Sequence, residues 1–527
     1  MAKQSPCKVI ESRRQTDLPL TWGGSAMVTS SVTPTTVSAE RGLARKTLRT
    51  SSLVTFGATA SSPMAVLVGG IVATYAATGN TSVAASFLLL TVVMLLWAPG
   101  YIAIARYVQP SGIFYTALAA GLSRLVGVAG APVVLLAYNT IQISLYGLLG
   151  SVVSGLIGGP WWIFALIAWA IVAAFGLQRT GVSTAMFGTI LIVEVALLIV
   201  FVLVGLAHPA GGNLTFEALN PTQLFSTGVV AGLAVLPLGF AAFFGTETIA
   251  AYGAEARSPR AVSRSIIYVI VGLGLLYALC AWAMVATVGA DRVIDLARDP
   301  AAPLPFEVFS DSRAGSAGVL LMALGGLLLI SSVLAAMISF HNSVARYLFT
   351  LGKDRLLPAR LATIREGGSG APQGGSIAQS VTALIVILLF VVSGAEALTM
   401  FTWLSNIAAV SLMLLMAMSS LATVRFFARG GGRSESLWAR AIAPTLGGIA
   451  IGVILLVTLI NISAALGTPP GSHRAWLVPG TVGAFVLIGV LWAISLRARQ
   501  PELLDGFGER ETNPTRQVDE DLGHLTL

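Results

Sequence analysis

Long apolar runs, separated by short polar segments, fill most of this chain. A run of about 20 apolar residues is long enough to cross a bilayer as a helix, and the sequence contains twelve such runs. They lie near residues 53–76, 83–106, 132–156, 161–178, 185–206, 226–252, 265–288, 316–349, 376–393, 398–424, 438–463 and 474–497. The pattern predicts an all-α polytopic membrane protein with twelve transmembrane helices.

Two of the runs are interrupted by helix breakers and small hydroxyl residues. The first run contains Gly57 and the string Ser61-Ser62-Pro63, and the sixth contains Gly245-Thr246-Glu247. An unwound backbone is tolerated at membrane depth only where it lines a cavity in the protein. Paired broken spans are typical of secondary transporters built from inverted repeats. We therefore expect a substrate site between two repeats.

The positions of the broken runs predict the domain organisation. They are the first and sixth spans, so each repeat has five spans and the two repeats have opposite topology. We expect a transporter core at 53–424, with repeats near 53–206 and 226–424, and two additional helices at 438–497. Residues 1–52 are Ser/Thr-rich and basic and are expected to form a disordered cytoplasmic tail. Residues 498–527 are expected to form a second, solvated cytoplasmic tail.

Composition and charge agree with the membrane assignment. The chain is 55% hydrophobic and 10% charged, whereas soluble domains carry about 25% charged residues. Its net charge of +8 is explained by basic loops on one side. Fifteen Lys and Arg residues fall in loops assigned to the inside and four in loops assigned to the outside. This asymmetry predicts a multi-pass protein of the cytoplasmic membrane with both termini in the cytoplasm.

Three stretches carry a family resemblance. The string Phe243-Phe244-Gly245-Thr246-Glu247 leads into an acidic, proline-containing and basic loop at 255–265. The eighth span ends in Arg346-Tyr-Leu followed by Arg355 and Pro358, and Gly112, Tyr115 and Gly121 follow the second span. Over residues 50–430 the chain resembles the amino acid–polyamine–organocation superfamily of secondary transporters. The resemblance implies a leucine-transporter-type fold with a 5+5 inverted repeat, peripheral C-terminal helices and transport by alternating access.

The chain also departs from that superfamily. The first span has Ala-Thr-Ala-Ser-Ser-Pro at 58–63 in place of the usual G-S-G-I-F string. Glu194 lies in the fifth span, in the region where some members carry a proton-linked lysine. A coupling scheme based on that lysine therefore cannot be carried over.

The first break suggests a site for a substrate carboxylate. Proline suits the first turn of a helix, where its missing N–H costs nothing. If 57–62 unwinds, the helix that restarts at Pro63 directs free N–H groups into the cavity. Carboxylate capture is assigned to the backbone at Ala60, Ser61, Ser62 and Pro63, with a hydroxyl donor from either serine. The alternative is a proline kink satisfied by Ser and Thr side chains.

The second break suggests a site for an amino group. Gly245 allows the sixth span to unwind, and the carbonyls of Phe244, Gly245 and Thr246 then become available to an ammonium group. Phe240, Phe243 and Phe244 supply an apolar wall or gate, or only packing.

Further polar and aromatic side chains lie in other spans. Tyr138 and Gln142 are four residues apart in the third span and therefore share a helix face. They either line the pathway or bond neighbouring helices. Trp403, in the tenth span, either closes the pocket or fills the core.

Two carboxyl groups lie well inside the predicted spans. Glu247 follows the second break and Glu194 lies in the fifth span. Ionisable groups at this depth are expensive and usually functional, and desolvation favours their protonated form. Both are candidate proton-coupling residues; the alternative is a neutral carboxyl that holds helix ends together. Ser331 and Ser332 are weak sodium-site candidates, because hydroxyls of this span help to bind Na⁺ in sodium-coupled relatives.

We therefore expect a permease for amino acids or related amino-bearing compounds, driven by an ion gradient with H⁺ favoured over Na⁺. Membrane lipid and a small-molecule substrate are the expected partners. No metal site, nucleic-acid site or ATP site is expected, because the four histidines lack ligand spacing and the Gly-rich loops lack a phosphate-binding lysine. An amino acid/polyamine exchanger and a non-transporting nutrient sensor remain alternatives. An enzyme is not expected.

Overall fold

The computed structural model describes residues 48–108, 112–177, 180–226, 228–253, 255–299, 304–309, 317–364, 371–431, 435–469 and 471–505. All of them belong to one unit, Gly42–Leu527. Most of the two predicted tails lies outside the described residues. The first helix begins at Thr50 and Leu48 already pairs with Ala256, so order starts before the predicted tail end at residue 52. The backbone hydrogen bonds of Leu48 with the 255–257 segment account for this difference.

Helices form nearly all of the described secondary structure. The α-helices are α1 (Thr50–Ser61), α2 (Pro63–Ala65), α3 (Val72–Thr78), α4 (Val83–Ile104), α5 (Ile113–Gly121), α6 (Arg124–Ile157), α7 (Trp161–Gly176), α8 (Thr180–Ala207), α9 (Pro221–Leu224), α10 (Val229–Leu233), α11 (Leu236–Phe240), α12 (Pro259–Val288), α13 (Ala290–Arg298), α14 (Leu304–Glu307), α16 (Ala317–Lys353), α17 (Gln373–Val392), α18 (Ala397–Ala428), α19 (Ala443–Ile460), α20 (Ile462–Ala465), α21 (Leu477–Arg499) and α22 (Pro501–Asp505). Segments of π-helix cover Val66–Ile71 and Trp438–Ile442, and 3₁₀ turns cover Ala210–Gly212, Glu217–Leu219, Ala241–Phe243, Glu247–Tyr252, Ala359–Ala362 and His473–Trp476. In this part of the chain the only β-pairings are isolated bridges.

The predicted fold class is confirmed. Within the described ranges, eleven helical segments are long and apolar enough to cross a membrane, and the remaining predicted span is the apolar but shorter α7, with 16 residues. One helix boundary differs clearly from the prediction. The third span was expected to begin near residue 132, but α6 begins at Arg124. The Ser123 side chain accepts a hydrogen bond from the Val126 N–H and caps the helix there, and Pro132 is accommodated inside it.

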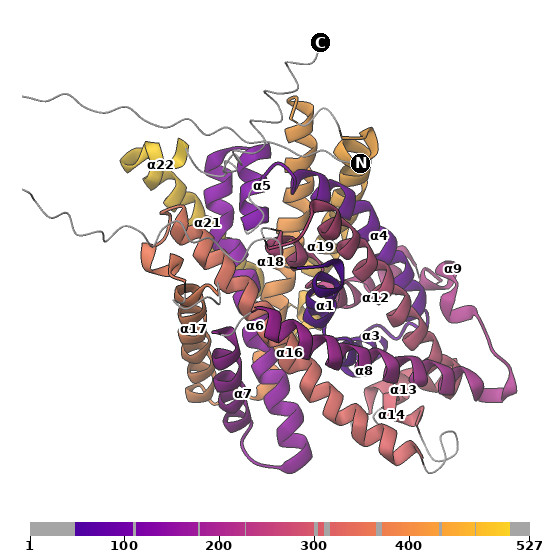
Figure 1. The fold of residues 1–527 in the computed structure, drawn as a ribbon. Coiled ribbons are helices and arrows are strands. Elements are labelled where there is room, and N and C mark those ends of the chain that lie inside the picture. Colours follow the sequence, from indigo (N-terminus) through magenta and orange to yellow (C-terminus); the bar gives the residue numbers. More distant parts are fainter. Residues whose placement is uncertain are drawn as a thin grey trace, which may run out of the picture. The chain divides into compact units, whose positions relative to one another are not determined.

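The first broken span lies in the interior of the helix assembly. α1 packs against α8, α12, α16 and the 3₁₀ segment Glu247–Tyr252, and Figure 1 shows it surrounded by longer helices. α18 packs along α6, and α4 packs along α12. The last two long helices are peripheral: α19 lies against α18 and α4, and α21 lies mainly against α6.

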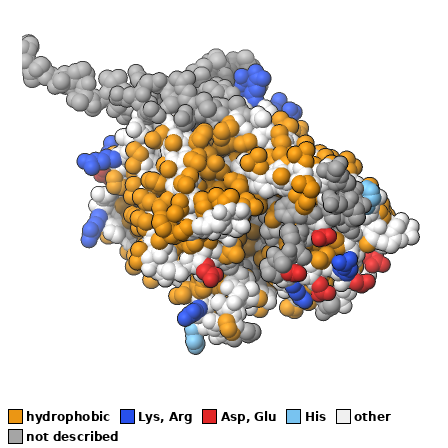
Figure 2. All heavy atoms as spheres, turned by 90° about the horizontal axis from the view of Figure 1, so that it is seen from below, with side chains coloured by type: hydrophobic (Ala, Val, Ile, Leu, Met, Phe, Trp, Pro, Cys, Tyr) orange, Lys and Arg blue, Asp and Glu red, His pale blue; other side chains and the backbone are white. Residues whose placement is uncertain are grey.

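The outer surface is apolar. Hydrophobic side chains cover much of the face seen in Figure 2. Large apolar side chains on the membrane-length helices are exposed, among them Ile192, Val392, Ile449 and Leu491. Extended exposed apolar surface marks contact with another apolar phase, so these faces are the lipid-contacting sides of the helices.

Candidate functional site

The first break is confined to one residue. α1 continues to Ser61, and Ser62 alone leaves the helix with φ 51° and ψ 71°. Its N–H donates to the Thr59 carbonyl at 3.0 Å, and Pro63 begins the next helical turn. Because proline has no N–H to continue the ladder, the chain turns at the residue before it. A non-glycine residue in the left-handed region is strained, at a cost of about 1–3 kcal/mol.

Of the segment 57–62, whose unwinding was the condition for a carboxylate site, only Ser62 leaves the helix. Gly57 is helical, and its role is close packing. A Cβ at this position would come within 2.5 Å of Cδ1 of Ile249, in the outgoing part of the sixth span. The missing side chain lets the first and sixth spans approach each other.

The second break lies where the sequence places it. Phe244 is extended (φ −62°, ψ 137°) and Gly245 has φ +106°. The Gly245 N–H donates to Oε2 of Glu247 at 2.9 Å, and the Thr248 hydroxyl donates to the Gly245 carbonyl at 2.6 Å. Residues 247–252 then form a 3₁₀ helix in place of the expected α-helix.

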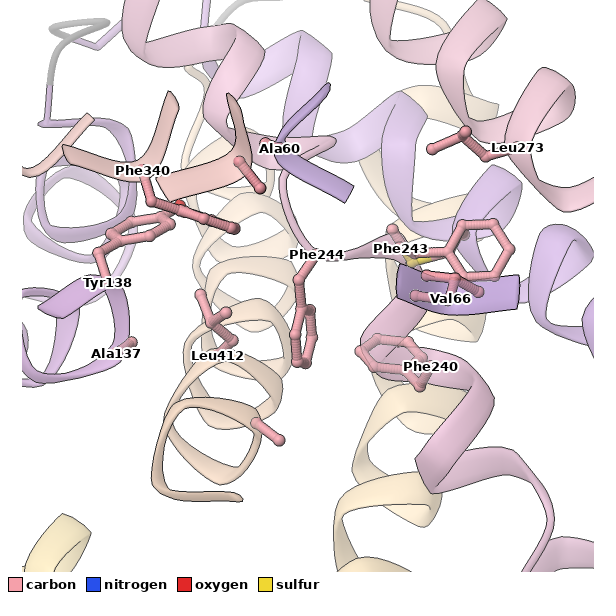
Figure 3. Close-up of a cluster of buried hydrophobic side chains, with 14 of the residues drawn as sticks. Ala60, Val66, Ala137, Tyr138, Phe240, Phe243, Phe244, Leu273, Phe340 and Leu412 are labelled. Atoms are coloured by element: carbon pink, nitrogen blue, oxygen red, sulfur yellow. The ribbon is translucent and has the colours of Figure 1, made fainter. Parts of the chain in front are cut away.

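The two breaks touch each other. A Cβ added to Gly245 would lie 2.5 Å from Cβ of Ala60 and 3.1 Å from the backbone nitrogen of Ser61. Figure 3 shows Ala60 beside the segment that carries Phe243 and Phe244. Residues about 185 positions apart in the sequence thus lie against each other.

Glu247 is one of two buried carboxyls at the site. It is 1% exposed, and its carboxyl has the Gly245 N–H and the Tyr138 hydroxyl as polar neighbours. The Tyr138 hydroxyl is directed at this carboxyl, and the neighbouring Thr246 hydroxyl is buried without a partner in the described part of the chain. Unpaired buried polar atoms are rare and require an explanation. Glu247 and Tyr138 therefore form a buried polar pair at the second break.

Glu194 is the other buried carboxyl, and it closes the first break. Its Oε1 accepts a hydrogen bond from the Met64 N–H at 2.5 Å and from the Ser332 hydroxyl at 2.6 Å. The hydroxyls of Ser62 and Ser332 lie 2.9 Å apart. Glu194 therefore ties the restarting helix to α8 and α16.

Two tyrosines that the sequence analysis missed complete the contacts. Tyr277, in α12, lies with its hydroxyl 2.6 Å from the Ser61 hydroxyl, and Ser61 donates to the Ala242 carbonyl. Tyr101, in α4, donates to the backbone carbonyl of Glu247 at 3.0 Å. The sequence did contain a sign of these contacts. Each tyrosine places a phenolic hydroxyl in the middle of an apolar span, and such a hydroxyl requires a hydrogen-bond partner when it is buried.

Other predicted residues lie elsewhere. Gln142 accepts from Gln379 of α17 at 2.9 Å and donates to Tyr146 at 2.8 Å, so it bonds helices together. Ser331 donates to the Leu328 carbonyl of its own helix, unlike Ser332. Trp403 is half-buried in α18.

Aromatic side chains surround the breaks. Phe240, Phe243 and Phe244 are buried, and the rings of Phe240 and Phe244 meet edge to face with centroids 5.7 Å apart. Figure 3 shows Phe243 and Phe244 pointing to different sides of their segment, with Tyr138 near Phe340. The ring centroids of Tyr138 and Phe340 are 6.3 Å apart.

A buried ion pair lies beyond the second break. Arg346 of α16 donates to Glu255 at 2.7 Å, and both side chains are almost fully buried. The guanidinium carbon lies 4.2 Å from the ring centroid of Tyr252, which stacks on Phe56 with centroids 4.6 Å apart. Leu48 joins this end through its backbone bonds with the 255–257 segment.

No group of His, Cys, Asp and Glu suited to hold a metal ion occurs in the described part of the chain.

Comparison with known proteins then gives a family. A family model described as amino acid permease matches residues 48–491. No curated protein matches the chain.

A solved structure similar to this chain is a manganese transporter from Eremococcus coleocola, in complex with an aromatic bis-isothiourea substituted compound. The two chains are 12% identical, and the TM-score is 0.50. The similarity covers 86% of this chain and 95% of the other. At this identity the likeness concerns the fold alone.

Proposed function

Because the chain belongs to the amino acid permease family, in the amino acid–polyamine–organocation superfamily, and is a multi-pass membrane transporter, we propose that it is a secondary active permease. It moves amino acids or related amino-bearing compounds across the cytoplasmic membrane by alternating access, with proton-coupled import. The contact between the two broken spans, through Ala60 and Gly245, is the observation that carries this proposal. Both termini are assigned to the cytoplasm.

The roles of the site residues follow from their chemistry. The carbonyls of Phe244 and Thr246 and the Tyr138 hydroxyl are assigned to the amino group of the substrate, whereas the Gly245 carbonyl already accepts from the N–H and the hydroxyl of Thr248. The coupling proton is assigned to Glu247 or Glu194, because a buried carboxyl with few partners can gain and lose a proton as its surroundings change. Protons are favoured over sodium because two buried carboxyls, Glu247 and Glu194, lie at the breaks.

Uptake into proteoliposomes tests this proposal. A panel of radiolabelled amino acids and amines is offered under an imposed pH gradient and, separately, under an imposed Na⁺ gradient. We expect concentrative uptake driven by the pH gradient and abolished in Glu247→Gln. Glu217→Gln, at an exposed position between α8 and α9, is the matched control and should behave like the wild type.

The remaining outcomes assign the alternatives. Coupling that survives in Glu247→Gln moves the proton to Glu194. Uptake driven only by Na⁺ contradicts proton coupling. Movement of label only when the opposite side is loaded identifies an exchanger, and ligand binding without flux identifies a sensor.

A further inference from the structure

A line of buried tyrosines leads away from the second break. Tyr138 of α6, Tyr347 of α16 and Tyr115 of α5 are each at most 1% exposed. The ring centroids of Tyr138 and Tyr347 lie 5.3 Å apart, and those of Tyr347 and Tyr115 lie 5.9 Å apart. Tyr115 and Tyr347 belong to the stretches that carry the family resemblance, and the substrate site uses neither of them.

The line starts at Glu247. The Tyr138 hydroxyl is directed at the Glu247 carboxyl, and the Tyr347 hydroxyl is directed at that of Tyr138. Tyr101 also faces Glu247, but its hydroxyl donates to the backbone carbonyl of that residue at 3.0 Å. The tyrosines around this carboxyl therefore offer one continuation, through Tyr138 to Tyr347.

The line ends at one end of α16. The Tyr115 hydroxyl contacts the Thr350 side chain and interacts electrostatically with Asp354. Thr350 is 2% exposed, whereas Asp354 follows the last residue of α16 and is partly exposed. The basic residues Lys353 and Arg355 assign this end to the cytoplasmic side. A carboxyl within reach of water thus stands at the far end of the line from Glu247.

The hydroxyls of Tyr347 and Tyr115 both lie at the beginning of α5. That of Tyr347 is beside the backbone of Phe114, and that of Tyr115 lies against Gly112, where an added Cβ would overlap it. The first N–H groups of a helix have no partner within the helix. A water molecule between the two hydroxyls therefore has both of them and a backbone N–H as partners, which is the number that a buried water needs.

Packing alone does not account for these hydroxyls. A phenylalanine would make the same ring contacts, whereas a buried hydroxyl costs free energy unless it is hydrogen-bonded. A tyrosine hydroxyl both accepts and donates a hydrogen bond. Hydroxyls in series can therefore pass a proton along without any of them staying ionised.

We propose that these tyrosines conduct the coupling proton between Glu247 and Asp354. On release, the O–H bond of Glu247 breaks as its proton joins Tyr138, which gives its own proton to Tyr347. The water passes the proton from Tyr347 to Tyr115, and Tyr115 passes it on to Asp354 and the solvent. Each hydroxyl gains one proton and loses one, so the net change is one proton moved. This inference rests on the proposed function, because it supplies a route for the proton assigned there to Glu247.

Proton exchange in the purified protein tests the route without any substrate. The infrared band of the protonated Glu247 carboxyl, assigned by its loss in Glu247→Gln, is followed in detergent after a rapid pH step. Tyr347→Phe and Tyr115→Phe keep the rings and remove the hydroxyls. A positioned proton-transfer group contributes about 10²–10⁴-fold to a rate, so we expect each variant to slow the band at least about tenfold, with a melting temperature close to that of the wild type.

Tyr75→Phe is the matched control. Tyr75 is also fully buried, but its hydroxyl donates to the Ala281 carbonyl at 2.9 Å, away from the line. This variant should keep the wild-type rate, whereas Asp354→Asn should slow the band as the two line variants do. A role in folding alone would lower the melting temperature and leave the rate unchanged.

The route and the permease function can fail separately. Wild-type rates in both line variants, or the lack of any Glu247 band that follows the pH step, would overturn the route even if a pH gradient drives uptake. Slowed exchange in these variants, with no uptake of any compound of the radiolabelled panel by the wild type, would support the route and contradict the proposed function. Slowed exchange together with reduced pH-driven uptake in the same variants would support both.

Discussion

At the scale of single residues, Gly245 bears the strictest requirement in the site. Its φ of +106° lies in a region that side chains with a Cβ rarely adopt. Its Cα hydrogen also faces Ala60, where a Cβ would be 2.5 Å away. Glycine is thus required at this position for two independent reasons, its backbone conformation and the lack of space for a Cβ. Both reasons concern the contact between the two broken spans.

Replacing this glycine should damage transport more than folding. Gly245→Ala is expected to cost about 1–3 kcal/mol in backbone strain and to push the spans apart at Ala60. Uptake should fall at least about tenfold, with a moderate drop in melting temperature in detergent. Gly272→Ala, in α12, is the matched control because it has open space and an ordinary φ. Wild-type uptake by Gly245→Ala would show that the close contact is dispensable.

The partners of Glu194 show where prediction from sequence ends. The carboxyl was recognisable as costly in an apolar span. Glu194 contacts Met64, about 130 residues before it in the sequence, and Ser332, about as far after it. No local periodicity predicts such distant contacts. Tyr277 and Tyr101 were missed for the same reason, because a tyrosine in a span reads as apolar until its hydroxyl partner is known.

At the scale of elements, the helix-breaking residues predicted where the two spans break but not how many residues leave the α-helix at each break. Pro63 and Gly245 marked the right places. Of the segment 57–62, only Ser62 is unwound, and this one left-handed residue redirects the chain. The sixth span is distorted further than expected, with a 3₁₀ segment from Glu247 to Tyr252. Packing against α1 and α16 decides such details, and a linear pattern does not contain it.

The pair of Arg346 and Glu255 connects α16 to the segment after the sixth span, and its removal should be costly. Losing one partner of a buried ion pair costs about 3–5 kcal/mol, because a charge is left uncompensated. We expect Arg346→Ala to lower the melting temperature strongly. The double variant Arg346→Ala with Glu255→Ala should lose less than the sum of the two single variants.

The ion pair of Arg106 and Glu435 provides the control for this cycle. It has a similar length, 2.8 Å, but the arginine side chain is 45% exposed. Exposed pairs contribute about 0–1 kcal/mol, so Arg106→Ala should change the melting temperature little. Strictly additive losses at Arg346 and Glu255 would show that the buried pair does not act as a unit.

At the scale of the whole molecule, hydrophobic periodicity and turn residues were enough for the fold class, the number of apolar helices and the peripheral position of the last two. Their success has a simple cause, since a membrane requires every spanning segment to satisfy its own backbone. The boundaries of the two five-helix repeats stay a prediction. So does the orientation, which rests on the distribution of basic residues among the loops.

The two natural cysteines make the orientation measurable. Cys280 is fully buried in α12, so an impermeant maleimide should report on Cys7 in the N-terminal tail. We expect Cys7 to be labelled in inside-out vesicles and protected in right-side-out vesicles, because fifteen basic residues fall on the predicted inner side against four outside. Asn213→Cys in a Cys7→Ser background, at an exposed position after α8, should give the opposite pattern. Labelling of both cysteines from the same side would contradict an odd number of spans between them. If Cys7 were instead labelled in right-side-out vesicles and the cysteine at position 213 in inside-out vesicles, the topology would be inverted. The Arg346–Glu255 end of the site would then lie on the outer face.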